Sequence, residues 1–209
     1  MRPILFALFL TGVISAQQDL PYDPEPPPNA AFVRVINATA APLKLNMNGE
    51  MLAIPAKRAS AYRVIAKTSL PVQVGTQTLN FPLKAKTFYS VAVVNQGAAL
   101  KTVLLTDGQS FPRTKAALSI YNLSDAKTVS LKTADGNTTV FQRIAPLQMK
   151  SLLVNGIAVQ LTAFADGKPI QTLQNVQFQI GFAYSVLVMG QRGHYTASFV
   201  PSTTTRSTP

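Results

Sequence analysis

Short runs of alternating apolar and polar residues, separated by turn dipeptides, most constrain what this chain can fold into. In the first run Val33 and Val35 flank Arg34. The same period of two recurs at residues 43–47, 118–120, 129–131 and 159–161. The dipeptides Asn48-Gly49, Asp107-Gly108, Asp135-Gly136, Asn155-Gly156 and Asp166-Gly167 punctuate the runs at hairpin-like spacing. Because no dozen residues keep a helical period and 15 prolines oppose long helices, the pattern predicts an all-β fold.

The chain contains an internal repeat. Val33-Arg-Val-Ile-Asn37 resembles Leu118-Ser-Ile-Tyr-Asn122 at an offset of 85 residues, and the segment around Tyr89 resembles the segment around Tyr184 at an offset of 95 residues. Since the order of features is kept, we expect two tandem small β-sandwiches, immunoglobulin-like or jelly-roll-like, each with about seven short strands. Each of the two tyrosines should pack its ring against the core and bond its hydroxyl to the backbone.

The first residues match the three-part pattern of a secretory signal peptide. Met1-Arg2-Pro3 is a basic start, an apolar run follows as far as Ile14, and Ser15-Ala16 offers small residues for cleavage. An uncleaved membrane anchor is the alternative, but the run is shorter than the roughly 20 apolar residues that a span needs. With no cysteine in the chain, we predict an exported protein of the bacterial periplasm.

Composition sets the other boundaries. We expect a proline-rich extended lead-in at 17–30, a first β-sandwich at 31–105, a linker at 106–114, a second β-sandwich at 115–200 and a disordered tail at 201–209, after the signal peptide at 1–16.

Little in the sequence supports catalysis. The lack of cysteine excludes disulfides, iron–sulfur clusters and thiolate zinc sites, and the single histidine, His194, excludes a multi-histidine metal centre, so no cofactor or metal is expected. His194 follows Gly190-Gln-Arg-Gly193 and reads as a surface histidine beside a turn. No Gly-x-Ser-x-Gly pattern accompanies it. Asp107 and Asp125, like Asp135 and Asp166, look like turn residues.

Three asparagines match the glycosylation sequon. They begin the tripeptides Asn37-Ala-Thr39, Asn122-Leu-Ser124 and Asn137-Thr-Thr139. In an exported bacterial protein we interpret them more simply as turn residues.

The chain is strongly basic, with 19 Lys and Arg against 8 Asp and Glu and a formal charge of +11. Lys57, Arg58, Arg63 and Lys67 lie within one stretch and form the candidate binding patch. Such a surface attracts anions, most strongly at low salt. An acidic polysaccharide, an anionic membrane face and an acidic protein are the candidate partners, and nucleic acid is not expected. The other interpretation is that the charge serves solubility alone.

Two segments carry a resemblance to a known family. Lys115-Ala-Ala-Leu-Ser-Ile-Tyr-Asn-Leu-Ser-Asp125, followed by Ser130-Leu-Lys-Thr-Ala-Asp-Gly136, resembles the second half of the AlgF-type periplasmic proteins of alginate O-acetylation. Phe32-Val-Arg-Val-Ile-Asn-Ala38 resembles the opening of their first domain, and Tyr22-Asp-Pro24 their short proline-rich start.

The resemblance implies a non-catalytic accessory subunit that bridges periplasmic and membrane-anchored acetyltransferase subunits during exopolysaccharide synthesis. It supplies no catalytic residue to carry over. We add the hypothesis that the stretch from Lys57 to Lys67 contacts the polyuronate or an acidic face of a partner. Three alternatives stay open: a stand-alone binding module for an anionic envelope polysaccharide, an enzyme that uses Ser or Tyr with His194, and a chaperone that uses sheet edges. The low aromatic content, 8% with no tryptophan, speaks against a sugar-stacking platform.

Overall fold

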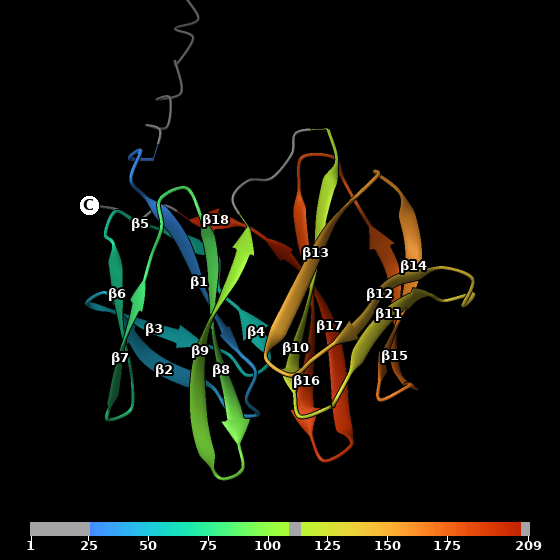
Figure 1. The fold of residues 1–209 in the computed structure, drawn as a ribbon, viewed down its shortest axis with the longest axis horizontal. Helices are drawn as coiled ribbons and strands as arrows, with labels where there is room; N and C mark the ends of the chain where they lie inside the picture. Colours follow the sequence, from blue (N-terminus) through green and yellow to red (C-terminus); the bar gives the residue numbers. More distant parts are fainter. Residues whose placement is uncertain (1–25, 109–113, 206–209) are drawn as a thin grey trace, which may run out of the picture.

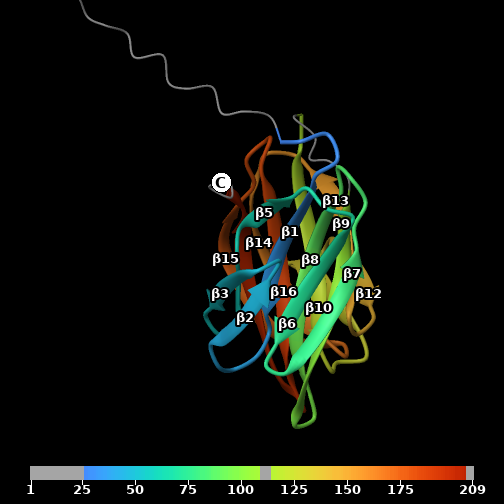
Figure 2. The same cartoon turned by 90° about the vertical axis from the view of Figure 1, so that its left-hand side faces the viewer.

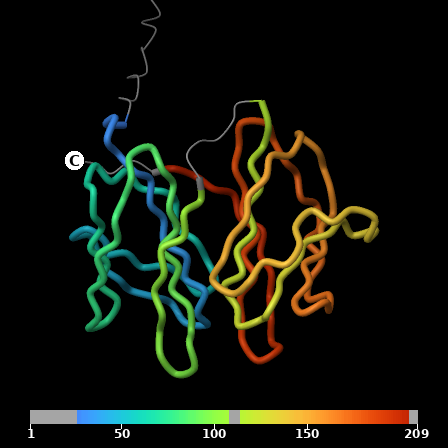
Figure 3. Tube along the Cα trace, viewed as in Figure 1, coloured from blue at the N-terminus to red at the C-terminus, as the bar shows by residue number. Residues whose placement is uncertain are grey.

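The computed structural model describes residues 26–108 and 114–205, and every regular element in them is a β-strand. The all-β prediction is confirmed. The expected signal peptide and most of the lead-in lie outside the described residues. The strands form four sheets, which we call A, B, C and D, and the blue-to-green half of the chain lies beside the yellow-to-red half (Figures 1 and 3).

Sheet A belongs mainly to the first half and has the order β18-β5-β1-β8-β9, with β4 also paired to β1. Its strands are β1 (Ala31–Asn37), β4 (Arg58–Ala59), β5 (Tyr62–Ile65), β8 (Phe88–Gln96), β9 (Ala99–Gly108) and β18 (Thr204–Thr205). Sheet B covers its outer side with the order β3-β2-β6-β7, and Figure 2 looks onto this sheet. Its strands are β2 (Leu43–Met47), β3 (Glu50–Ile54), β6 (Ser69–Val74) and β7 (Gln77–Pro82).

Sheets C and D repeat this arrangement in the second half. Sheet C has the order β13-β10-β16-β17, with β10 (Ala116–Ser124), β13 (Gln148–Val154), β16 (Ala183–Gln191) and β17 (His194–Ser202). Sheet D has the order β12-β11-β14-β15, with β11 (Val129–Thr133), β12 (Thr139–Ile144), β14 (Ala158–Ala165) and β15 (Lys168–Gln177). The parallel pair β1–β8 corresponds to the parallel pair β10–β16, so the repeat seen in the sequence is a repeat of strand order.

Three apolar clusters lie between successive sheets and give the layer order B, A, C, D. One fills the space between A and B, with Val33, Val35 and Leu45 among its members. A second fills the space between C and D, with Leu118 and Leu131 among its members. The third joins A to C through residues of β1, β8, β9, β10 and β16. Sheets A and C are therefore covered on both faces.

Several turns follow the sequence prediction. Asn48 and Gly49 close the β2–β3 hairpin with φ values of 56° and 91°, and Asp166 and Gly167 close β14–β15 with 48° and 80°. Positive φ at both positions is the geometry that Asn-Gly and Asp-Gly favour. The backbone hydrogen bonds predicted for the hydroxyls of Tyr89 and Tyr184 are also confirmed. The Tyr89 hydroxyl accepts the Lys84 N–H, and the Tyr184 hydroxyl accepts the Gln179 N–H.

Two boundary predictions need correction. Residues 106–114 were expected to be a linker, but β9 continues to Gly108 and Asp107 is buried rather than in a turn. Residues 201–209 were expected to be a disordered tail, but β17 runs to Ser202 and β18 pairs in parallel with β5. The Tyr62 N–H also donates to the Thr203 carbonyl. The chain therefore ends its described part as a strand of the first half's sheet.

Candidate functional site

The face between sheets A and C, which we call the seam, is the place where both halves contribute side chains. Its middle is apolar and contains nine buried residues: Ile36, Ala38, Ala92, Val94, Leu105, Tyr121, Leu123, Leu187 and Met189. A buried polar network lies on one side of this cluster, and two pockets open on the other side, beside the β8–β9 and β16–β17 hairpins.

The polar network centres on Arg34, whose side chain is only 1% exposed. Its guanidinium donates to the hydroxyls of Ser90, Tyr121, Ser185 and Ser202, at 2.8 to 3.0 Å. Alternation within β1 predicts a polar residue facing water at this position, because Arg34 lies between two core valines. The structure overturns that expectation, since the second face of sheet A is covered by sheet C.

Asp107 supplies the opposite charge. Its carboxylate accepts hydrogen bonds from the hydroxyls of Tyr62, Ser90 and Tyr121 at 2.6 to 2.8 Å. Ser90 and Tyr121 each contact both charged groups, because each accepts from Arg34 and donates to Asp107. The Asp-Gly dipeptide that signalled a turn is therefore part of a strand, where the carboxylate fills a buried polar site.

The network favours charged arginine and neutral tyrosines. Burial by itself lowers the pKa of Arg34, but Tyr121, Tyr62 and Asp107 outweigh this effect and hold that pKa above its ordinary value. Burial, with the adjacent Asp107, raises the pKa of Tyr62 and of Tyr121. The Arg34 guanidinium lies 4.7 Å from the centre of the Tyr62 ring and 5.4 Å from that of Tyr121, within cation–π range. These groups fix the two halves to each other.

The two pockets are related by the internal repeat, and each has a volume of about 230 Å³. Lys57 in one and Leu147 in the other each follow, by three residues, an isoleucine whose carbonyl accepts the amide of Asn37 or Asn122. Both have left-handed backbones, with φ of 56° and 57°. Such values are uncommon outside glycine and asparagine.

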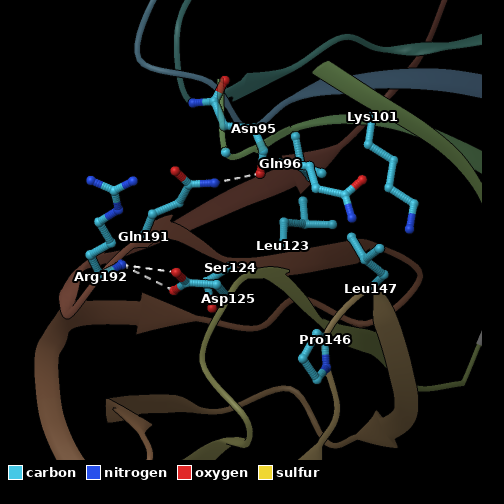
Figure 4. A pocket seen from close by; sticks show the side chains of 12 residues that line it. Asn95, Gln96, Lys101, Leu123, Ser124, Asp125, Pro146, Leu147, Gln191 and Arg192 are labelled. Atoms are coloured by element: carbon cyan, nitrogen blue, oxygen red, sulfur yellow. Dashed lines mark hydrogen bonds between the residues drawn. The ribbon is translucent and has the colours of Figure 1, made fainter. Parts of the chain in front are cut away.

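The leucine pocket contains Leu147 and takes its other walls from both halves. Leu123, Leu147 and Pro146 line it from the second half, while Gln96 and Lys101 line it from the β8–β9 hairpin (Figure 4). Its lining thus combines an apolar floor with polar groups at the rim.

The lysine pocket contains Lys57 and adjoins the leucine pocket. Ala38 and Ala40 line it from the first half, and Gly190 and His194 from the second. Asn95, Leu123 and Gln191 line both pockets. The Gln191 side-chain amide donates to the Asn95 carbonyl, so this hydrogen bond stands where the pockets meet (Figure 4).

Asp125 holds the rim of the leucine pocket in place. Its carboxylate accepts from the backbone N–H of Arg192 and from the Tyr195 hydroxyl. Burial and this hydrogen bond raise the pKa of Tyr195. The acidic group is therefore used in shaping the β16–β17 hairpin, and the Arg192 and Lys101 side chains form no ion pair within the described residues.

The predicted basic patch is spread along sheet A. Arg58 stands opposite Asn37 at one end of β1, and Arg63 stands opposite Val33 nearer the other end. Arg63 is ion-paired with Glu50, and Lys67 donates to the side chain of Asn48. Lys57 lines the lysine pocket. Whether these four residues bind an anion stays a prediction.

His194 is exposed at the start of β17, beside the turn that the sequence indicated. The residues that line its pocket carry no carboxylate and no hydroxyl, so a Ser–His–Asp arrangement has no partners there. Within residues 26–108 and 114–205, no three His, Asp or Glu side chains are grouped to hold a metal ion. No helix of these residues is long and apolar enough to cross a membrane.

Sequence reasoning missed the residues that matter most at the seam. In the sequence Arg34 looks like an ordinary strand residue and Asp107 like a turn residue, and no motif marks Lys101. One signal could have found Arg34: its position in the repeat corresponds to Ser119, so an arginine stands where the other copy has a small residue.

Comparisons with known proteins cover both halves. A sequence model of the family described as "Alginate O-acetyl transferase AlgF" matches residues 7–185. The chain is 29% identical over 173 residues to the Alginate biosynthesis protein AlgF of Pseudomonas aeruginosa, covering 82% of this chain and 78% of that one. It is 28% identical over 182 residues to the protein of the same name from Azotobacter vinelandii, covering 86% and 82%. A solved structure of the C-terminal domain of AlgF from P. aeruginosa is 31% identical and aligns with a TM-score of 0.39, covering 42% of this chain and 98% of that one.

Proposed function

Because the chain belongs to the AlgF family, we propose that it is a non-catalytic periplasmic subunit of an alginate O-acetylation complex, in which it bridges acetyltransferase components. The family is described as an alginate O-acetyl transferase. The residues around His194 therefore have to be tested for the groups that acetyl transfer needs. The chemistry around His194 supports the accessory role, because the described residues that line its pocket include no hydroxyl and no carboxylate. In the adjoining pocket the Ser124 hydroxyl donates to Asn122, and the Asp125 carboxylate accepts from Arg192 and Tyr195.

The observation that carries the proposal is the locked seam. The Arg34 side chain donates hydrogen bonds to four hydroxyls. One hydroxyl comes from β8 of sheet A, and the other three come from β10, β16 and β17 of sheet C. Strand β18 then crosses from the second half to sheet A. A protein whose two halves are held in one fixed arrangement can keep two partners at a fixed separation, which is what a bridging subunit has to do.

We further propose that each half is a β-sandwich domain with its own core, as the sequence repeat indicates. The separate clusters between A and B and between C and D support this division. Native-state hydrogen exchange tests it, since two domains should show two groups of amides that exchange with different opening free energies. A single global exchange class would contradict it.

The test of the accessory function is deletion of the gene in its own host. Ester-linked acetyl on the secreted polymer is measured by proton NMR. We expect polymer to be made with less acetyl, and the gene supplied on a plasmid to restore it. Unchanged acetylation would overturn the proposal.

A second candidate is a stand-alone binding module for an anionic polysaccharide. It is favoured by cationic side chains that line the pockets and form no ion pair with another described residue, among them Lys57, Lys101 and Arg192. Binding of polymannuronate by the purified protein, falling steeply between low and physiological salt, would support it. The role of Lys57, Arg58, Arg63 and Lys67 as an anion-binding patch is part of this candidate, and weak salt dependence would count against it.

A further inference from the structure

We propose that the leucine pocket and the lysine pocket together bind one extended segment of a partner protein, with an aliphatic side chain in the first and a carboxylate in the second. This inference rests on the accessory function proposed above and names the chemistry of the partner. It starts from the relation between the pockets, since each combines the left-handed residue of one half with the hairpin of the other.

The two pockets have similar volumes but differ in chemistry. At corresponding positions the leucine pocket has Leu147 and the lysine pocket has Lys57. Ala38, which corresponds to Leu123, lines the lysine pocket alone, whereas Leu123 lines both. Transfer of an aliphatic side chain from water to the apolar lining of the leucine pocket is favourable. A carboxylate is attracted to Lys57, for which the described residues supply no ion-pair partner.

The spacing of the pockets fits neighbouring side chains of one chain. They share Asn95, Leu123 and Gln191 as a common wall. Side chains two residues apart on an extended segment lie about 7 Å from each other on the same face. The side-chain amide of Gln96 stands at the rim with no hydrogen-bond partner among the described residues, and amides of this kind bond the backbone of an extended peptide.

Charge and composition select the kind of occupant. Lys101 and Arg192 add two cationic groups to the leucine pocket and Asp125 adds one carboxylate, so that with Lys57 the linings of the two pockets are positive on balance and attract an acidic segment. Among the described residues no Phe, Tyr or Trp ring lines either pocket, so a sugar ring would lack the broad apolar surface on which it stacks. These features favour a protein segment over the polysaccharide.

The experiment places a photoreactive benzoylphenylalanine at Gln96 in the full-length protein in its own host. After irradiation, the cross-linked peptide is identified by mass spectrometry. We expect an adduct with a protein segment that carries an aliphatic residue two positions from an acidic one. An adduct that contains uronate, an adduct with a segment lacking acidic residues, or no adduct would each overturn the proposal.

Matched substitutions connect the adduct to the pockets. K57N and L147N each remove the proposed contact, and asparagine tolerates a left-handed backbone, so both variants should fold. K86N is the control, because Lys86 has a φ of 57° and is exposed but lines neither pocket. We expect the adduct to fall about fivefold or more in K57N and in L147N and to stay unchanged in K86N. An equal yield in all three variants would overturn the proposal.

Polymer acetylation in the same strains separates the two hypotheses. Suppose that deletion lowers acetylation, whereas K57N and L147N change neither acetylation nor the yield of the adduct. In that case the pocket inference fails and the accessory function stands. If deletion leaves acetylation unchanged, the accessory function fails, and the identity of the adduct still decides what the pockets bind.

Discussion

Arg34 and Asp107, the oppositely charged residues buried at the seam, are joined through two shared hydroxyls and not by a direct ion pair. The Ser90 hydroxyl lies 2.8 Å from the guanidinium and 2.6 Å from the carboxylate. The Tyr121 hydroxyl lies 2.9 Å and 2.7 Å from the same two groups. Each charge is therefore satisfied by neutral groups that also connect it to its opposite, which couples sheet A to sheet C.

The first prediction concerns this coupling. R34M and D107N should each lower the free energy of unfolding by about 3 kcal/mol, because each leaves the other charge buried and uncompensated. The double variant should cost clearly less than both single changes added together, since it removes both charges. Urea unfolding of the four proteins measures this double-mutant cycle. Simple additivity would show that the two charges do not interact.

The second prediction is a loss of stability at alkaline pH. Tyr62 and Tyr121 have raised pKa values in the folded protein, whereas an unfolded tyrosine ionises near pH ~10. Below that pH the contribution of the two tyrosines to the free energy of unfolding is fully present. It is lost as the pH rises, because the unfolded state releases tyrosine protons that the folded state keeps. Urea midpoints between pH 8 and pH ~11 should fall accordingly.

Y62F provides the comparison for the alkaline effect. It removes one hydroxyl bonded to Asp107, so stability at neutral pH should be lower, but the decline with pH should be shallower. A decline as steep as in the natural sequence would mean that Tyr62 is not among the groups responsible.

The third prediction concerns the repeated asparagines. The Asn37 amide donates to the carbonyls of Ala41, Ile54 and Pro55, and its oxygen accepts from Thr39. N37A should therefore cost about 2 to 3 kcal/mol, because buried carbonyls lose their donors. N122A should cost a similar amount, as the Asn122 amide makes the corresponding bonds in the second half.

N137A is the control for the asparagine variants. It alters the third sequon, which is exposed, and should change the free energy of unfolding by less than about 0.5 kcal/mol. Thermal unfolding measured side by side distinguishes the three proteins. Equal effects at all three positions would contradict the assignment of Asn37 and Asn122 as buried anchors.

The fourth prediction concerns the hairpin that lines both pockets. Gly190 has a φ of 123°, and a Cβ added there would lie 2.1 Å from the His194 carbonyl oxygen. Gly193 has a φ of 82° with open space around it. G193A should cost about 1 kcal/mol, and G190A about 3 kcal/mol or the loss of soluble protein. Comparable soluble yield and melting temperature for the two would contradict the close approach at Gly190.

The fifth prediction separates the accessory role from catalysis. H194A should leave acetylation of the secreted polymer at the level of the natural sequence, because none of the described residues that line the His194 pocket carries a hydroxyl or a carboxylate. Proton NMR of the polymer measures the acetyl content. A loss comparable to that of gene deletion, from a variant that folds normally, would indicate a catalytic histidine.

Much of the fold could be read from neighbouring residues. The hairpins at Asn48-Gly49 and Asp166-Gly167 form because their backbone preferences are local. The same local logic fails at Asp107, where three hydroxyls from other strands outweigh the turn preference of the Asp-Gly pair. It fails again after residue 200, where the chain is held by pairing with β5, a strand far away in the sequence.

What the sequence by itself determined is the all-β class, the repeat and the family, because alternation, turn chemistry and motif order are carried by short stretches of chain. Only the tertiary structure decided that β1 is covered on both faces, so that Arg34 is buried and meets Tyr121, 87 positions away. It also decided that Leu147 and Lys57 line adjoining pockets. The physical reason is that period-two alternation reports which residues share a face, whereas the burial of the second face depends on the packing of one half against the other.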